Sequence, residues 1–180
     1  LPACEEHDLL ECLDKMLENT GIPFLFDLRA YDISQSKLAS NELMESCGVP
    51  LPLPWPECGF PIIVKPSSQS GSVGVSVAHD DKELKEGLER IGRLHDEPVI
   101  QEFVHGKSIS IEVIGNGEHA LSFVTTEVVL DSGYDCKEVR CFPDILDEED
   151  QKVLSQCSER IAQSLGLNGL MDVEAILTPK

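Results

Sequence analysis

Two short runs of β-branched residues, "PIIVKP" at 61–66 and "VGVSVAH" at 73–79, constrain the fold more than any other feature of this sequence, because only residues 67–72 separate them. Their valine and isoleucine content is typical of buried strands. Parallel strands need a crossover of about a dozen residues or more, usually a helix. The two runs must therefore pair as an antiparallel hairpin. This predicts an α+β fold and not a doubly wound α/β sheet.

The loop of this hairpin, which follows Lys65, is the first candidate binding site. In P-loops and dinucleotide-binding fingerprints the glycine-rich loop leads into a helix. Here the lysine precedes the loop and a strand follows it, so both motifs are excluded. Glycine N–H groups and serine hydroxyls could still bind an anion, and the alternative is an ordinary mobile hairpin tip. The candidate ligands are Lys65, Ser67, Ser68, Gly71, Ser72 and Gly74.

Apolar periodicity and turn residues divide the rest of the chain into helices and strands. Helices are predicted over 5–21, 32–48, 80–94 and 146–166. Strands are predicted over 22–26, 98–104, 107–115, 119–130 and 170–177, and the turn "GNGE" makes 107–130 a second hairpin. The segment 49–61 contains five prolines and is expected to be a stiff, extended linker.

Composition excludes several classes of function. The net charge of −19 argues against binding to nucleic acid or to an anionic membrane surface. No apolar run reaches the ~18 residues that a membrane span needs. The seven cysteines contain no C-x-x-C pair and indicate free thiols in a reducing cytoplasm. Exposed charges beyond about 10 Å are largely screened, so a few well-placed lysines could still bind a small anion.

The segment "IQEFVHG" at 100–106 is a second candidate site. A strand that runs into Gln-Glu-Phe-Val can present backbone N–H and C=O groups to the edge of a flat ring, with apolar neighbours beside it. The alternative is a core strand that ends in a turn. The residues concerned are Gln101, Glu102, Phe103 and Val104.

The segment "GLMDVEAI" at 169–176 is the third. Asp172 and Glu174 lie two residues apart, on one face of a strand that is otherwise apolar. Two carboxylates on a buried face need cationic partners or a metal, and oxygen ligands suit Mg²⁺. The alternatives are that one of them faces solvent or that both pair with basic residues.

These motifs, in this order, resemble the ATP-grasp family of carboxylate–amine ligases over roughly residues 31 to 180. The resemblance implies ATP and Mg²⁺ as cofactors. It makes Lys37, in "SQSKLASNELMESCGVPLP", the first nucleotide lysine. It gives Lys65 to the phosphates, residues 67–74 to a lid, and the segment around Gln101 to the adenine. Counting from Gly169 favours Glu174 over Asp172 as the metal ligand.

The family fold consists of two α+β subdomains that hold ATP between them. The resemblance implies a small subdomain over 59–104, with the lid, and a large one over 105–180 that is truncated before its second metal strand. It implies a connecting helix and linker over 31–58 and the tail of an N-terminal Rossmann-like domain over 1–30. The chain is thus expected to be a central piece of a longer ligase. Ser108 stands where many relatives have a ribose-binding glutamate.

The implied reaction activates a carboxylate as an acyl phosphate, which an amine then attacks. Three segments, "LASNELMESCGVPLPLPWP", "KPSSQSGSVGVS" and "YDCKEVRCFP", are most similar to the ligases of pyrrolysine biosynthesis, which implies small amino-acid substrates. Lys65 and Arg140 are the expected catalytic residues, and Glu112 and Asp135 could bind substrate amino groups. Arg140 could instead belong to a solvated strand, and Glu112 could face solvent. Two alternatives stay open: a D-alanine–D-alanine-type ligase or carboxylase, and a non-catalytic ATP-binding module.

Overall fold

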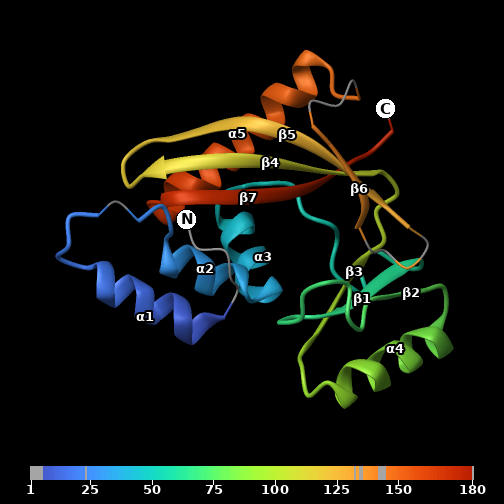
Figure 1. Ribbon diagram of the computed structural model, residues 1–180. Helices are drawn as coiled ribbons and strands as arrows, with labels where there is room; N and C mark the ends of the chain where they lie inside the picture. The colour runs from blue at the N-terminus through green and yellow to red at the C-terminus, as the bar shows by residue number, and fades with distance from the viewer. Residues whose placement is uncertain (1–5, 23, 132, 134–135, 142–144, 180) are drawn as a thin grey trace.

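A computed structural model describes the chain except residues 1–5, 23, 132, 134–135, 142–144 and 180. Its helices are α1 (His7–Leu17), α2 (Leu28–Ser34), α3 (Lys37–Ser46), α4 (Asp81–Arg93) and α5 (Glu148–Leu165). Its strands are β1 (Ile62–Pro66), β2 (Ser76–Ala78), β3 (Pro98–Glu102), β4 (Lys107–Asn116), β5 (Ala120–Leu130), β6 (Cys136–Cys141) and β7 (Asn168–Leu177). The strands form two antiparallel sheets, which confirms the predicted α+β class (Figure 1).

The smaller sheet has the order β2-β1-β3 and contains the predicted hairpin. Ile62 on β1 pairs with Ala78 on β2 and with Glu102 on β3. Ile62, Val64 and Ala78 pack with Ile91 of α4, so α4 covers one face of this sheet. The other face therefore carries Lys65 and its alternating neighbours.

The predicted second strand of the hairpin, 73–79, is shorter in the structure because the backbone turns at its start. Ser72 and Gly74 have φ angles of 58° and 79°, which a strand does not permit. A Cβ atom on Gly74 would also lie 2.8 Å from Leu94 Cδ1. Glycine is needed here both for the backbone conformation and for the close packing.

The larger sheet has the order β6-β5-β4-β7, with the hairpin β4–β5 at its centre. Its α5-facing side is apolar: Ile109, Ile111 and Val113 on β4 are buried with residues of α5. Helix α5 begins at the N-cap Asp147, whose carboxylate accepts hydrogen bonds from two backbone N–H groups, and ends at Gly166 in the left-handed conformation. Helix α5 covers only this side of the sheet.

The strand predicted over 22–26 is wrong, because among its described residues none is in a strand. An apolar run of five residues does not separate strand from loop by itself. The Phe26 ring packs against Tyr31, with ring centroids 5.6 Å apart. Asp27 then caps α2 by accepting the Ala30 N–H at 3.0 Å, so the chain turns into a helix directly after the aromatic residues.

The helix predicted over 32–48 is divided in two. Ser36 has an extended conformation and caps α3 by accepting the Ala39 N–H at 3.2 Å. The proline-rich linker that follows runs beside β3, where Pro54 bridges to Gln101 and the Glu102 N–H donates to the Leu53 carbonyl at 2.8 Å. Within the described part of the chain, no helix combines the length and apolar character needed to cross a bilayer.

Candidate functional site

The face of the larger sheet that turns away from α5 carries a row of carboxylates. The antiparallel register places Glu112 on β4 opposite Asp172 on β7, and Ser110 opposite Glu174. The residues between them, such as Val173, pack toward α5. The alternation predicted for Asp172 and Glu174 is therefore confirmed. Their face is open, however, and not buried as the apolar segment suggested.

Asp172 is electrostatically strained in this row. Partial burial and the neighbouring carboxylates of Glu112 and Glu174 raise its pKa to about 6, although a hydrogen bond with Ser110 opposes the shift. A bound cation would relieve this repulsion. Among the described residues, no three histidine, cysteine or acidic side chains are already arranged as metal ligands. The carboxylates would therefore have to move closer together to coordinate a cation.

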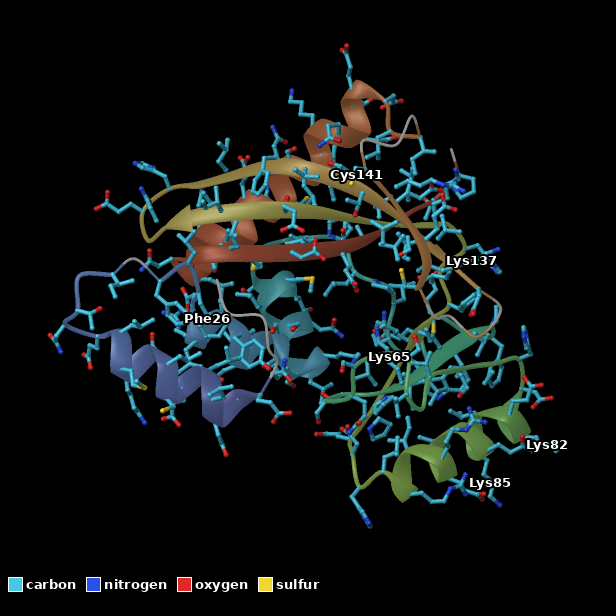
Figure 2. All side chains as sticks on the ribbon, viewed as in Figure 1. Phe26, Lys65, Lys82, Lys85, Lys137 and Cys141 are labelled. Carbon is cyan, nitrogen blue, oxygen red and sulfur yellow. The ribbon has the colours of Figure 1, made fainter. Side chains whose placement is uncertain are left out.

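Two lysines lie within electrostatic range of Glu174. Lys65, on β1, is half-buried, and its pKa is lowered by burial and by Lys37, with Glu174 opposing the shift. Lys37, the first residue of α3, has a pKa lowered by burial, with Asp96 and Glu174 opposing it. The two lysines and Glu174 are therefore within electrostatic reach of one another. Figure 2 shows Lys65 on the side of the smaller sheet turned toward α3.

The lid segment 67–74 begins against α3. The Lys37 N–H donates to the Ser67 carbonyl at 3.0 Å, and the Lys37 Nζ donates to the carbonyls of Gln69 at 2.5 Å and Ser67 at 3.4 Å. Ser68 donates its N–H and its hydroxyl to Asp96. Two of the predicted phosphate ligands, Ser67 and Ser68, are thus engaged by protein groups, whereas Gly71 lies in the exposed tip.

The predicted hinge contains a buried polar atom without a partner. Gln101 is 8% exposed, and among the described residues its Oε1 has no hydrogen-bond partner. It pairs with Ile63 on β1, so it shares the face of Lys65. The Glu102 carboxylate instead accepts the Leu53 N–H of the linker at 3.3 Å, and the Phe103 ring packs edge-on against His105 at 4.9 Å. Of the four predicted hinge residues, Gln101 offers the clearest acceptor for a ligand.

Arg140 does not share the face of the carboxylates. It pairs with Glu127 on β5, and Glu127 pairs with Ile109, whose side chain packs on the α5 side. Its guanidinium contacts Glu127 at 3.3 Å and Glu138 at 2.9 and 3.0 Å. The predicted contact of Arg140 with an acyl phosphate stays a prediction. Asp135, predicted to bind substrate, lies outside the described residues.

Asp96 is a residue of this region that the sequence analysis missed. It precedes β3, and its carboxylate is the common acceptor for Ser68 and for the side-chain amide of Gln69. The antiparallel pairing of β1, which precedes the lid, with β3 would have indicated it. Pro66 at the end of β1 lies opposite Pro98 at the start of β3, which places residue 96 beside residue 68.

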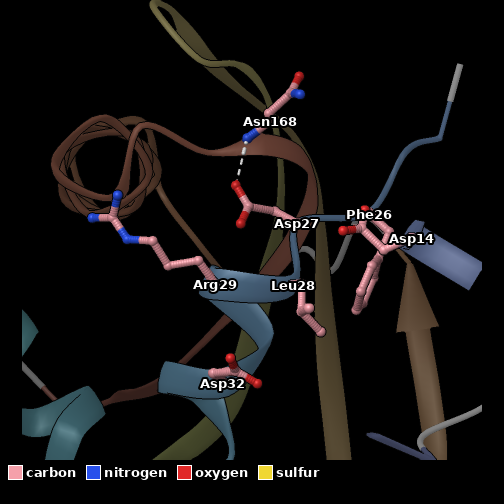
Figure 3. A pocket seen from close by; sticks show the side chains of 7 residues that line it. All are labelled: Asp14, Phe26, Asp27, Leu28, Arg29, Asp32 and Asn168. Atoms are coloured by element: carbon pink, nitrogen blue, oxygen red, sulfur yellow. Dashed lines mark hydrogen bonds between the residues drawn. The ribbon is translucent and has the colours of Figure 1, made fainter. Parts of the chain in front are cut away.

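A separate surface cavity of about 440 Å³ lies among α1, α2 and the start of β7 (Figure 3). The Asp27 carboxylate accepts the Asn168 N–H there at 2.9 Å. None of the predicted site residues that the structure describes lines this cavity. Its lining residues are Asp14, Phe26, Asp27, Leu28, Arg29, Asp32 and Asn168.

Comparison with known proteins places this arrangement in a family. Residues 40–180 match the family model described as "D-ala D-ala ligase C-terminus". The chain belongs to this ATP-grasp family. The match contains both sheets, the lid segment, the predicted hinge and the carboxylate row, so the family resemblance inferred from the motifs is confirmed. Lys37 lies just outside the matched range.

Relatives of this ATP-grasp chain include the 3-methyl-D-ornithine–L-lysine ligase of Methanosarcina barkeri, which is 38% identical over 180 residues, 100% of this chain and 46% of that protein. The biotin carboxylase domain of 2-oxoglutarate carboxylase from Hydrogenobacter thermophilus, solved with MgADP, ADP and bicarbonate, gives a TM-score of 0.80 at 16% identity, over 97% of this chain and 43% of that one. The VanG D-Ala:D-Ser ligase of Enterococcus faecalis gives a TM-score of 0.74 at 21% identity, over 93% of this chain and 55% of that one.

These similarities confirm the ATP-grasp fold. The chain spans about half the length of the curated relatives it matches.

Proposed function

We propose that this chain is the nucleotide-binding part of an ATP-dependent carboxylate–amine ligase that uses Mg²⁺. The observation that carries the proposal is the convergence of Lys37, Lys65 and Glu174 from α3, the smaller sheet and the larger sheet. Two cations beside a carboxylate row match the charge distribution of a metal–triphosphate complex. Each lysine about 4 Å from a phosphate would contribute roughly 4 kcal/mol at an effective dielectric of 20, before desolvation costs.

The adenine would lie against the face of the smaller sheet that carries Gln101. Among the described residues, no group donates to the buried Gln101 Oε1, and the exocyclic amino group of adenine is a donor of the required kind. Lys65 on the same face would then contact the phosphates. The tip of the lid, including Gly71, Ser72 and Gly74, would close over them, because an acyl phosphate exposed to water hydrolyses.

Mg²⁺ would be held on the carboxylate row by Glu174 and Asp172. Carboxylate oxygens are the ligands that Mg²⁺ prefers, and a cation at this place would offset the repulsion that raises the pKa of Asp172. When bound, the ion neutralises phosphate charge. The MgADP complex of the Hydrogenobacter thermophilus domain supports a magnesium nucleotide as the ligand of this fold.

The residues of the site would act mainly by positioning and by offsetting charge. A substrate carboxylate oxygen bonds to the γ-phosphorus, and the bond from that phosphorus to ADP breaks. Lys65 and Lys37 stabilise the negative charge that shifts onto the phosphates. The amine of the second substrate then bonds to the acyl carbon, phosphate leaves, and the amine gives up a proton.

We propose 3-methyl-D-ornithine and the ε-amine of L-lysine as the substrates, in pyrrolysine biosynthesis in the cytoplasm. The support is the 38% identity to the Methanosarcina barkeri ligase, which extends over the whole chain. A diamino acid needs anionic partners for its ammonium groups. Glu112, which lies on the carboxylate face opposite Asp172, is the candidate partner within the described residues.

The test is ATP-dependent phosphate release with D-ornithine or 3-methyl-D-ornithine plus L-lysine, measured on the intact protein. D-alanine and bicarbonate serve as competing substrates. Lys65→Ala should abolish turnover, while Lys85→Ala should leave it unchanged, because Lys85 is exposed on α4 (Figure 2). Nucleotide binding without turnover on any of these substrates would identify a non-catalytic ATP-binding module instead.

A further inference from the structure

We propose that Asp96 is a positioning residue that anchors the first half of the lid, residues 67–69, so that only its second half, residues 70–74, moves over the phosphates. This inference rests on the proposed function, because it assigns a task within a loop that closes over ATP. It concerns a residue that holds the lid and does not itself contact the nucleotide.

The Asp96 carboxylate collects several hydrogen bonds from the first half of the loop. It accepts the Ser68 N–H at 3.3 and 3.2 Å, the Ser68 hydroxyl at 3.0 Å and the Gln69 side-chain amide at 3.3 Å. It also accepts the Glu97 N–H at 2.7 Å, which holds the carboxylate in place. Hydrogen bonds to an ionised acceptor are roughly twice as strong as neutral ones, so this single side chain fixes residues 68 and 69.

Asp96 stays ionised in this position. Desolvation alone would raise its pKa, but the hydrogen bonds from Ser68, Glu97 and Gln69 outweigh it, and the pKa lies below its usual value. The anchor is therefore a charged acceptor at neutral pH.

The fold brings Asp96 to the loop through strand pairing. The Pro66–Pro98 pair ends the β1–β3 ladder, and the Ser67 N–H donates to the Glu97 carbonyl at 2.8 Å, which extends the pairing by one step. Residue 96 must then lie beside residue 68. The anchor is thus part of the rigid sheet and not of the loop itself.

Residues 67–69 are also held from the opposite side, by α3. Ser36 and Ser67 place their hydroxyl oxygens 3.3 Å apart, and the Lys37 side chain donates to the Gln69 carbonyl. The first half of the lid is therefore clamped between the start of α3 and Asp96. Because Ser68 donates to Asp96, its N–H and hydroxyl are committed to the protein and not to a phosphate.

Residues 70–74 differ from this anchored half. The Val73 and Val75 N–H groups donate within the loop, to the carbonyls of Ser70 and Ser72, and the Val73 side chain is 49% exposed. Gly71 has φ +60° and Gly74 has φ +79°, conformations that glycine adopts at low cost. These two glycines bracket the tip and are suitable pivots.

The experiment compares the wild-type protein with Asp96→Ala, Asp96→Asn and the control Asp80→Ala. Asp80 caps α4 by accepting the Glu83 N–H at 2.8 Å, so its removal weakens the same subdomain without touching the lid. The measurements are the affinities for a non-hydrolysable ATP analogue with Mg²⁺ and for adenosine, and amide hydrogen exchange of residues 67–74.

Asp96→Ala should weaken binding of the ATP analogue by about tenfold, the effect of losing one charge-assisted contact, and leave adenosine affinity within about twofold. Amide exchange should accelerate at residues 68 and 97 but not at 71–74. Asp96→Asn should fall between Asp96→Ala and wild type, and Asp80→Ala should bind the analogue normally.

Equal analogue affinity of Asp96→Ala and wild type would overturn the positioning role while leaving the proposed function intact. So would a loss that Asp80→Ala shares, or one that affects adenosine equally, because either would show a general loss of stability. A wild-type protein that binds no ATP analogue contradicts the proposed function itself, and the positioning role with it.

Discussion

Asp172 on β7 lies directly opposite Glu112 on β4, with no basic residue between them in the ladder. Partial burial, together with repulsion by the facing Glu112 carboxylate, raises the pKa of Asp172 to about 6. The site therefore stores an unfavourable interaction that a cation would relieve. Both cation binding and folding stability should therefore depend on pH.

Magnesium affinity should rise with pH up to about pH 6. Below pH 6 Asp172 holds a proton that Mg²⁺ must displace, so the apparent affinity should fall by about tenfold per pH unit. Above pH 6 the carboxylate is ionised and the affinity should level off. Calorimetric titration of Mg²⁺ with ADP from pH 5 to 8 measures this. A flat profile across this range would contradict the assignment of Asp172.

Removal of the Asp172 charge should stabilise the metal-free protein at high pH. A carboxyl group whose pKa is higher in the folded state favours folding at low pH, and that contribution is lost as the pH rises through about 6. Because Asp172 is partly exposed, the gain from Asp172→Asn at pH 8 should be only about 1 kcal/mol after screening. Urea unfolding at pH 8 and pH 5 measures it, and a gain at pH 5 equal to that at pH 8 would argue against a charge effect.

Gln101→Leu should separate stability from binding. The substitution removes a buried Oε1 atom that has no hydrogen-bond partner within the described part of the chain, so the nucleotide-free protein should become more stable by about 1 kcal/mol. Affinity for ATP should fall about tenfold, because the adenine amino group loses its acceptor. Thermal melts and calorimetry with ATP and GTP test both effects. Unchanged ATP affinity would place the adenine elsewhere.

Glu127 should matter for stability and not for turnover. It is 7% exposed and contacts Lys107 and Arg140, each at 3.3 Å. Glu127→Ala removes the buried carboxylate but leaves two half-exposed cations that water can solvate, so it should cost about 1 kcal/mol of folding stability. Arg140→Ala, at a half-exposed position, should cost about 1 kcal/mol or less and change kcat by less than about threefold if it contacts no reacting atom. A hundredfold fall in kcat would identify Arg140 as a catalytic residue.

The hairpin and the sheet class were predictable because they follow from the length of the loop between the two strand-like runs. Six residues between Pro66 and Val73 leave no room for a crossover, so no tertiary information was needed. Likewise, the shared face of Asp172 and Glu174 follows from the two-residue period of a strand. Which face α5 covers depends on packing, and for that reason the carboxylates were expected to be buried.

The remaining features depend on contacts between distant segments. Asp96 acquires its role from the Pro66–Pro98 pairing, and Arg140 is directed away from Glu174 by the register of β6 on β5. The sequence of one strand does not reveal how its residues pair with those of another strand. The aromatic residues before α2 were assigned to a strand because their packing against Tyr31 was not visible in the periodicity.

The most direct test of the account is a crystal structure of this protein with a non-hydrolysable ATP analogue and Mn²⁺, whose anomalous signal locates the metal. The phosphates should lie within hydrogen-bond distance of the Nζ atoms of Lys37 and Lys65, and the metal should contact Glu174 or Asp172. A nucleotide bound elsewhere, such as in the cavity beside Asn168, or a metal that touches neither carboxylate, would contradict it.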